Sequence, residues 1–134
     1  MRRRILALLL IASAGMTMLG TPAFATQYTV VSGTSGDDRI VLGPQPHEIR
    51  GEGGDDFLAG GRSPDILRGG PGDDRLWTGL GGVPDQAYGG LGDDRLHNRD
   101  SGQVGQLLDG GPGFDICTGD KHDTFISCEV VKFA

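Results

Sequence analysis

The chain has 134 residues, which is enough for one small domain. Its 25 glycines disfavour helices, and an aromatic content of 6% is low for a conventional hydrophobic core. Its 18 acidic residues exceed its 12 Lys and Arg residues, which gives a formal net charge of -6. This charge balance argues against nucleic acid as a partner, and an anionic membrane surface would repel the chain.

Residues 1–25 have the composition of a secretory signal peptide. Three arginines at 2–4 precede an apolar run over 5–19, and Ala-Phe-Ala at 23–25 is a small-residue cleavage site. The alternative is a membrane anchor, but the run of about 15 residues is shorter than the roughly 20 that span a bilayer. We therefore expect cleavage after Ala25, secretion to the extracellular medium and no membrane insertion. Because the removed segment holds three arginines and no acid, the mature charge becomes -9.

A nine-residue repeat runs through the rest of the chain. Residues 69–77 (GGPGDDRLW) and 89–97 (GGLGDDRLH) both fit the pattern G-G-x-G-x-D-x-U-x, in which U is a large apolar residue. The same phase extends from residue 33 to residue 126, with interruptions at 78–79 and at 98–100. Full units begin at Gly33, Leu42, Gly51, Gly60, Gly69, Leu80, Gly89, Ser101 and Gly110, and an eight-residue unit begins at Gly119.

The eighth position of each unit predicts an inward-facing core residue. A triplet centred on it can form a short strand whose two outer residues point away from the core. Glycines in the preceding residues permit the positive φ angles of a tight turn. We therefore predict an all-β, right-handed parallel β-roll (β-helix solenoid) over 33–126, a capping strand in 26–32 and a C-terminal cap in 127–134. The predicted core residues are Ile40, Ile49, Leu58, Leu67, Leu76, Ala87, Leu96, Leu108, Cys117 and Phe125.

The small core of such a roll predicts that folding needs a cation. One large side chain per nine residues supplies roughly 1.5–3 kcal/mol, whereas ordering the backbone costs about 1–2 kcal/mol for every residue. Stacked acidic turns would also repel one another. Glycine-rich turns expose carbonyl oxygens and the sixth-position aspartates add charge, which suits Ca²⁺ because it prefers oxygen ligands. Zinc would favour His and Cys, which are sparse in this chain.

These tandem units resemble the RTX, or haemolysin-type, calcium-binding repeat over nearly all of residues 33–126. The resemblance implies several Ca²⁺ ions, each between the turns of one unit and of the next but one. By position the metal ligands would be Asp38, Asp56, Asp65, Asp74, Asp85, Asp94 and Asp115. The strongest site would lie between Asp56 and Asp74, where no insertion intervenes. His47 and Gln106 stand where an aspartate belongs, so the sites on their side of the roll depart from the family pattern.

A second acid stands at the fifth position of four units. One interpretation makes these acids part of the metal sites. The interpretation that we favour makes them solvated acids that a neighbouring Arg39, Arg75 or Arg95 neutralises. The four residues are Asp37, Asp55, Asp73 and Asp93.

Two cysteines, Cys117 and Cys128, stand near the C-terminus. In a secreted chain such a pair predicts one disulfide, which would close the last coil and contribute roughly 3 kcal/mol in the chain-entropy model. Two free thiols are the alternative. The surrounding segment, 108–129, also resembles the end of small secreted RTX-type proteins.

No catalytic constellation stands out. The chain lacks a G-x-S-x-G elbow, an H-E-x-x-H pair and an EF-hand loop. Its carboxylates recur at a structural period, which favours metal ligation over a unique acid–base pair. We therefore expect a secreted, non-enzymatic calcium-binding protein that needs Ca²⁺ to fold. The alternative is a calcium-rigidified adhesion or surface-interaction module, and a small secreted hydrolase has the least support.

Overall fold

The computed structural model describes residues 27–100 and 104–134, and the structural statements below refer to these residues. The expected signal peptide lies outside them, as do residues 101–103 at the start of one predicted unit. The described residues form twelve strands and no helix, so none of them builds a helix that could cross a membrane. The strands are β1 (Thr29–Ser32), β2 (Arg39–Val41), β3 (His47–Arg50), β4 (Phe57–Ala59), β5 (Ile66–Pro71), β6 (Arg75–Trp77), β7 (Gln86–Leu91), β8 (Arg95–His97), β9 (Leu107–Asp109), β10 (Ile116–Gly119), β11 (Thr124–Ile126) and β12 (Val130–Phe133).

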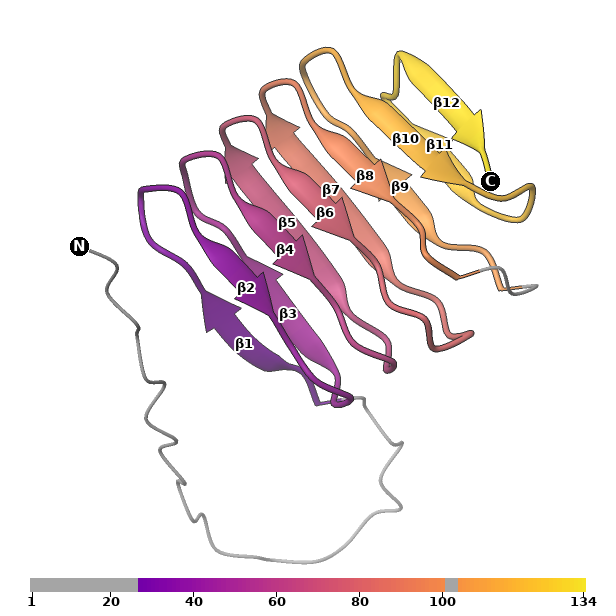
Figure 1. Ribbon diagram of the computed structural model, residues 1–134, viewed down its shortest axis with the longest axis horizontal. Helices are drawn as coiled ribbons and strands as arrows, with labels where there is room; N and C mark the ends of the chain where they lie inside the picture. Colours follow the sequence, from indigo (N-terminus) through magenta and orange to yellow (C-terminus); the bar gives the residue numbers. More distant parts are fainter. Residues whose placement is uncertain (1–26, 101–103) are drawn as a thin grey trace, which may run out of the picture.

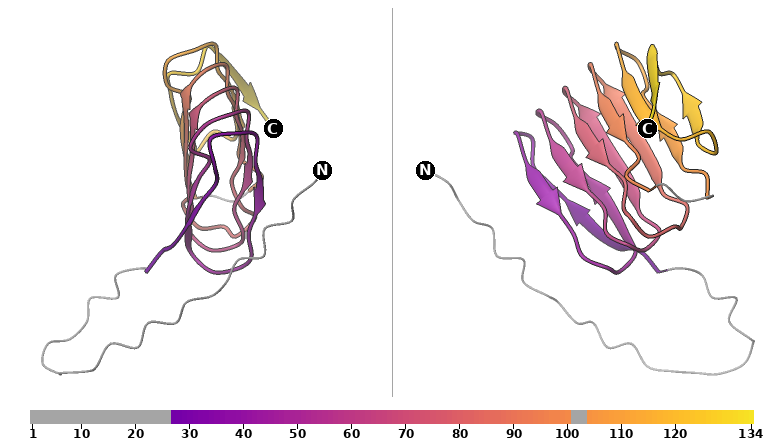
Figure 2. Two further views of the ribbon diagram at one scale, coloured as in Figure 1. Left: turned by 90° about the vertical axis from the view of Figure 1, so that its left-hand side faces the viewer. Right: turned by 45° about the vertical axis from the view of Figure 1, so that its right-hand side comes forward.

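The strands alternate between two parallel sheets. Odd-numbered strands form one sheet in the order β1-β3-β5-β7-β9-β11, and even-numbered strands form the other in the order β12-β10-β8-β6-β4-β2. Each coil therefore gives one strand to each sheet, and about six coils stack along one axis (Figure 1). Seen along that axis, the coils superimpose as a flattened loop in which the two sheets face each other (Figure 2). The predicted parallel β-solenoid is confirmed.

The core is the row of eighth-position residues between the sheets. In the even sheet Leu76 pairs with Leu58 on one side and with Leu96 on the other, and in the odd sheet Leu67 pairs with Ala87. Every predicted core residue faces inward, with the two end residues, Ile40 and Phe125, only partly buried. The fully buried members are Ile49, Leu58, Leu67, Leu76, Ala87, Leu96, Leu108 and Cys117.

The two insertions lengthen turns and leave the strand pairing in register. Both lie where the chain passes from an even strand to an odd one, at 78–79 after β6 and at 98–100 after β8. The inward residues of neighbouring coils stay aligned across them, as the pairs Leu76–Leu96 and Ala87–Leu108 show. At the two ends, β1 pairs with β3 and β12 pairs with β10, so the end strands continue the two sheets.

Candidate metal centre

The turns of the solenoid form two rows along its two narrow edges. The first row leads from odd to even strands and contains residues 33–38, 51–56, 72–74, 92–94, 110–115 and 127–129. The second row leads from even to odd strands and contains residues 42–46, 60–65, 78–85, 98–100 with 104–106, and 120–123. Both insertions therefore belong to the second row, and the predicted aspartates divide between the rows.

Acidic side chains in the first row form a continuous hydrogen-bonded ladder. One oxygen of each carboxylate accepts the backbone N–H of the corresponding residue one coil earlier. Each bond crosses from one coil to the next, so the ladder holds the coils at a fixed spacing. The bonds run from Asp38 N to Asp56 (2.7 Å), Asp56 N to Asp74 (2.8 Å), Asp74 N to Asp94 (2.8 Å), Asp94 N to Asp115 (2.8 Å) and Asp115 N to Glu129 (2.7 Å).

The second carboxylate oxygen, Oδ2, has no hydrogen-bond partner in four of these aspartates, and the four side chains are almost completely buried. Leaving a buried acceptor unsatisfied costs about 1–3 kcal/mol, and more when it is charged. Each Oδ2 packs against the first-position glycine of its own unit, such as Gly51 or Gly69, where a Cβ atom would collide with it. The four aspartates are Asp56, Asp74, Asp94 and Asp115.

In the second row, both oxygens of Asp65 and of Asp85 accept hydrogen bonds from protein donors. Asp65 accepts His47 N at 2.8 Å through Oδ1 and Gly61 N at 2.7 Å through Oδ2. Asp85 accepts Asp65 N at 2.8 Å through Oδ1 and Gly79 N at 2.9 Å through Oδ2. The buried aspartates of the two rows therefore differ in one respect, the partner of Oδ2.

Two further side chains complete the second row; the sequence placed Gln106 at the sixth position without predicting its role, and it missed Asp123. Gln106 replaces an aspartate, since its Oε1 accepts Asp85 N while its Nε2 donates to Val83 O at 3.1 Å. Asp123 accepts Gln106 N at 2.8 Å. Asp123 stands two residues before the inward Phe125, as each sixth-position aspartate stands two residues before its own inward residue. Counting backward from that residue, instead of forward from the glycines, would have found it.

The insertions are held by a buried polar network. Thr78 and Asn98 are the first residues of the two insertions, and both are buried. The Thr78 hydroxyl donates to Asn98 Oδ1 at 3.3 Å, and Asn98 Nδ2 donates to Asp123 Oδ2 at 2.8 Å. Asp123 Oδ2 also accepts the backbone N–H of Asp120 at 2.8 Å. Amide and hydroxyl groups of the protein therefore supply the hydrogen bonds in this part of the second row.

Burial raises the pKa of the sixth-position aspartates, because it penalises their charged form. The pKa of Asp74 is raised to about 6 and that of Asp94 to about 7, with further increments from neighbouring carboxylates, while backbone hydrogen bonds oppose the shift. In the second row the pKa of Asp85 is raised to about 6, again mainly by burial. The pKa values of Asp56, Asp65 and Asp115 are raised for the same reason.

The fifth-position acids form an outer ladder and are exposed, as the solvated interpretation expects, but no direct ion pair with an arginine accompanies them in the part of the chain that the structure describes. Each accepts the next coil's backbone N–H, from Asp55 N to Asp37 (3.0 Å), Asp73 N to Asp55 (3.0 Å), Asp93 N to Asp73 (2.9 Å) and Phe114 N to Asp93 (2.9 Å). Across the described residues, no ion pair joins them to Arg39, Arg75 or Arg95. Arg39 instead lies over the ring of Phe57, 4.2 Å from its centroid. All four acids are exposed, and Asp55, Asp73 and Asp93 line a groove of about 420 Å³ beside the first row.

The first row fits a hard cation that binds oxygen. No three His, Cys, Asp or Glu side chains of the described residues gather into a metal-binding group, so a metal here would need main-chain oxygens as well. The glycine carbonyls provide them, since those of Gly51, Gly69 and Gly89 stack one behind another against the preceding coil. Buried carboxylate oxygens without a donor, combined with carbonyl oxygens, make a donor set that Ca²⁺ prefers and Zn²⁺ does not.

In the comparison with known proteins, one family model matches part of the chain. The model of the RTX calcium-binding nonapeptide repeat, in four copies, matches residues 50–82 and 84–99. The match contains five of the seven predicted ligands, Asp56, Asp65, Asp74, Asp85 and Asp94. No enzymatic domain is identified beside these repeats. No curated protein and no solved structure matches the chain significantly.

Proposed function

Because the chain carries RTX calcium-binding nonapeptide repeats, we propose that it is a secreted, non-enzymatic protein that binds Ca²⁺ in its first row of turns and needs the metal to fold. One observation carries this proposal: four buried carboxylate oxygens of that row lack any hydrogen-bond donor. A row of charged, desolvated oxygens destabilises the fold unless a cation compensates it. Ca²⁺ supplies that compensation because it accepts six to eight oxygen ligands in irregular geometry.

The proposed ligands follow from which oxygens the protein leaves unsatisfied. Asp56, Asp74, Asp94 and Asp115 would provide the carboxylates of the principal sites. Asp38 differs because its Oδ2 accepts the N–H of Thr34 at 2.6 Å and the Thr34 hydroxyl at 2.9 Å. Asp38 and the second-row residues Asp65 and Asp85 would have to exchange such bonds for the metal, so we place them in weaker sites.

A requirement for calcium in folding suits a secreted protein. The composition of residues 1–25 is that of a signal peptide, and a disulfide joins Cys117 to Cys128, as in proteins of oxidising compartments. A chain that stays unfolded without calcium can be exported through a narrow channel. It would then fold outside, because binding free energy is folding free energy when the site exists only in the folded state.

A calcium titration of residues 26–134 followed by circular dichroism tests this function. We expect a disordered spectrum in chelator and a β-sheet spectrum with calcium, with a midpoint of about 0.1–1 mM, as in extracellular calcium modules. Magnesium at the same concentration should not replace calcium, because it prefers a strict octahedron. A complete β-sheet spectrum in chelator would contradict the folding requirement.

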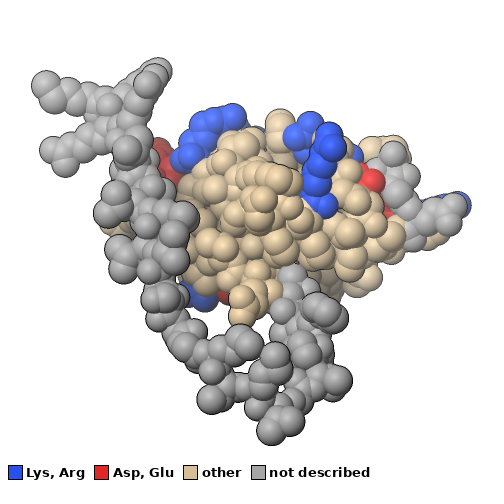
Figure 3. Space-filling model, turned by 90° about the horizontal axis from the view of Figure 1, so that it is seen from below, with Lys and Arg blue, Asp and Glu red and all other residues tan. Residues whose placement is uncertain are grey.

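A second candidate function, an adhesion module, is favoured by the outer face of the even sheet. The outward residues of its six described strands include no acid, although the chain as a whole is acidic. The rings of Phe57 and Trp77 lie 5.0 Å apart on this face, and those of Trp77 and His97 lie 6.1 Å apart. Lys and Arg side chains project from the roll in groups when it is seen from below (Figure 3). On the outer face of the even sheet the basic residues are Arg39, Arg75, Arg95 and Lys132.

An acidic polysaccharide suits this face, because its carboxylates can pair with guanidinium groups while its sugar rings stack on aromatic side chains. The formal net charge of the chain is negative, so it did not predict this basic surface. Binding of a polyuronate to the calcium-loaded protein should weaken at least tenfold in Trp77→Ala and in Arg95→Gln. It should stay unchanged in Arg50→Gln, which alters the odd sheet. Equal effects of Arg95→Gln and Arg50→Gln would reject the adhesion module in favour of non-specific attraction.

A further inference from the structure

The first row of turns continues beyond the last glycine-rich unit. Strand β12 pairs with β10 so that Val131 lies opposite Cys117. Glu129 precedes Val131 by two residues, as Asp115 precedes Cys117 by two. The Glu129 carboxylate accepts Asp115 N at 2.7 Å, as Asp115 accepts Asp94 N at 2.8 Å. Glu129 therefore occupies the position that a sixth-position aspartate fills in the earlier coils.

Ser127 takes the place of the first-position glycine in this last turn. Its carbonyl oxygen packs against Gly110, as the carbonyl oxygen of Gly110 packs against Gly89. The N–H of Gly110 donates to Ile126 O at 3.0 Å, which matches the bond from Gly51 to Arg68 O at 2.8 Å. Ser127 has a φ of 48°, a left-handed conformation that glycine usually provides. Three residues, 127–129, thus reproduce the contacts of a six-residue glycine-rich turn.

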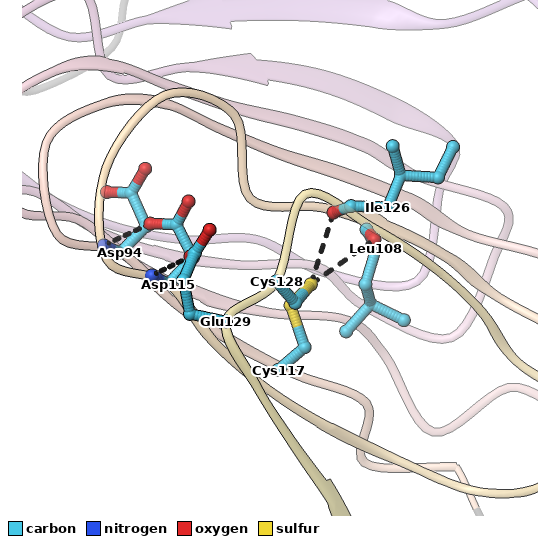
Figure 4. Close-up of a disulfide and its surroundings, with 7 residues drawn as sticks. All are labelled: Asp94, Leu108, Asp115, Cys117, Ile126, Cys128 and Glu129. Atoms are coloured by element: carbon cyan, nitrogen blue, oxygen red, sulfur yellow. Dashed lines mark hydrogen bonds between the residues drawn. A yellow bond between two sulfur atoms is a disulfide. The ribbon is translucent and has the colours of Figure 1, made fainter.

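Asp115 faces this turn with an unsatisfied oxygen. Its side chain has an exposed fraction of 0%, and its Oδ2 has no hydrogen-bond partner among the described residues. The carboxylates of Asp94, Asp115 and Glu129 lie in one row beside the last coil (Figure 4). Asp115 is therefore the last of the four aspartates with a buried oxygen that lacks a donor, and it lies next to the C-terminal turn of the roll.

The disulfide fixes the turn that carries Glu129. Cys128 directly precedes Glu129 and is bonded to Cys117 of β10, with Cα atoms 5.9 Å apart. The Cys128 sulfur also lies 3.2 Å from Ile126 O (Figure 4). Residues 127–129 contain no glycine to ease the tight turn. The covalent bond therefore restrains the one segment of the first row that lacks the repeat sequence.

We propose that Asp115, Glu129 and the main-chain carbonyl oxygen of Ser127 bind a terminal Ca²⁺ ion, and that the Cys117–Cys128 disulfide holds Glu129 in place for it. The site lies outside residues 50–82 and 84–99, which match the RTX repeat. It rests on the proposed function, because it uses the same metal and the same row. Its carboxylate pair is an aspartate and a glutamate, and the glutamate already reaches the N–H of Asp115 at 2.7 Å.

Native mass spectrometry of the secreted protein in saturating calcium tests this site by counting bound ions. Wild type should bind a fixed number of Ca²⁺ ions. Glu129→Gln should bind one fewer, because the amide still accepts Asp115 N but lacks the charge that Ca²⁺ requires. The double variant Cys117→Ala, Cys128→Ala should also lose one ion. Glu48→Gln on β3 is the matched control and should keep the full number. If Glu129→Gln fails to fold in calcium, Glu129→Ala is counted in the same way, and a full ion count in it would overturn the site.

The outcomes separate the terminal site from the proposed function. An unchanged ion count in Glu129→Gln would overturn the site, even with calcium bound elsewhere. One ion lost in Glu129→Gln but none in the double cysteine variant would overturn the role of the disulfide. Absence of bound calcium in wild type would overturn the proposed function, and the terminal site with it.

Discussion

The two rows of turns are made from the same nine-residue unit, yet they treat their buried carboxylates in different ways. In the first row Asp74 has one oxygen bonded to Asp56 N and the other without a partner. In the second row Asp85 is equally buried, but Gly79 N donates to the corresponding oxygen. The same residue type at the same repeat position therefore keeps a buried oxygen without a donor on one edge and has both oxygens bonded on the other.

The insertions explain part of this difference. Residues 78–79 add Gly79, whose N–H reaches Asp85, and residues 98–100 add Asn98, which donates to Asp123. The second row gains hydrogen-bond donors wherever it gains residues. The first row has no insertion, and second-position glycines that lead into it lie in the left-handed region, with a φ of 119° at Gly70 and 122° at Gly90. Insertions are not the whole cause, because Gly61 N donates to the second oxygen of Asp65 in a unit that has no insertion.

Neutralising one aspartate in each row should give the largest effect on calcium binding. Asp74→Asn removes a charge that no protein donor compensates, so the calcium midpoint should rise at least tenfold, or about 1.4 kcal/mol. Asp85→Asn removes an equally buried charge whose oxygens are already bonded, and the midpoint should change by less than about threefold. A circular dichroism titration of both variants measures this. Equal shifts would show that the rows do not differ in metal binding.

Acid pH should partly replace calcium in the chelated protein. Folding raises the pKa of Asp74 from 3.8 to about 6 and that of Asp94 from 3.8 to about 7, so the folded state binds more protons. Stability without metal is therefore highest near and below pH 4 and falls as the pH rises through 6 and 7. In chelator, circular dichroism should show more β-structure at pH 5 than at pH 7.5.

The double variant Asp74→Asn, Asp94→Asn is the control for this pH dependence. It lacks the two carboxylates with the largest first-row shifts, so its β-structure in chelator should vary less between pH 5 and pH 7.5. More structure at pH 7.5 than at pH 5 in wild type would contradict the assignment of these carboxylates as destabilising charges.

Glu52→Gly should give the smallest effect, a stabilisation of the first row. Glu52 has a φ of 80°, at the unit position that Gly70, Gly90 and Gly111 fill elsewhere. Glycine adopts this conformation without strain, so we expect a gain of about 0.5–1 kcal/mol. The thermal midpoint in saturating calcium should rise by several degrees. Gly70→Ala should lower it, since a Cβ there would collide with the Glu52 carbonyl. A lower midpoint for Glu52→Gly would show that its left-handed backbone is not strained.

The sequence predicted the fold well because a single period determines it. Glycines mark the turns and one apolar residue per unit marks the core, so the register from Ile49 to Cys117 follows without any long-range information. The disulfide was also predicted, since only two cysteines follow residue 25. Both inferences depend on local patterns that the parallel coils repeat without change.

The site was predicted only in outline. Position in the unit identified seven aspartates, but it does not determine which backbone N–H reaches the second oxygen of Asp65 or Asp74. That depends on the path of each turn. Gln106 and Glu129 were missed as ladder members because neither is an aspartate, and Asp123 because its unit is one residue short. The backbone path of each turn, more than the residue type, therefore decides whether the second carboxylate oxygen accepts a hydrogen bond.

The confinement of both insertions to one edge has a consequence for how such a protein can change. Strand pairing on either side of residues 78–79 and 98–100 is undisturbed, as Leu76 opposite Leu96 shows. The edge formed by the second row can therefore accept longer loops, different loops or a grafted peptide. The edge formed by the first row stays constant meanwhile. Selection could act on the two edges independently, for loop variation along the second row and for the aspartate ladder along the first row.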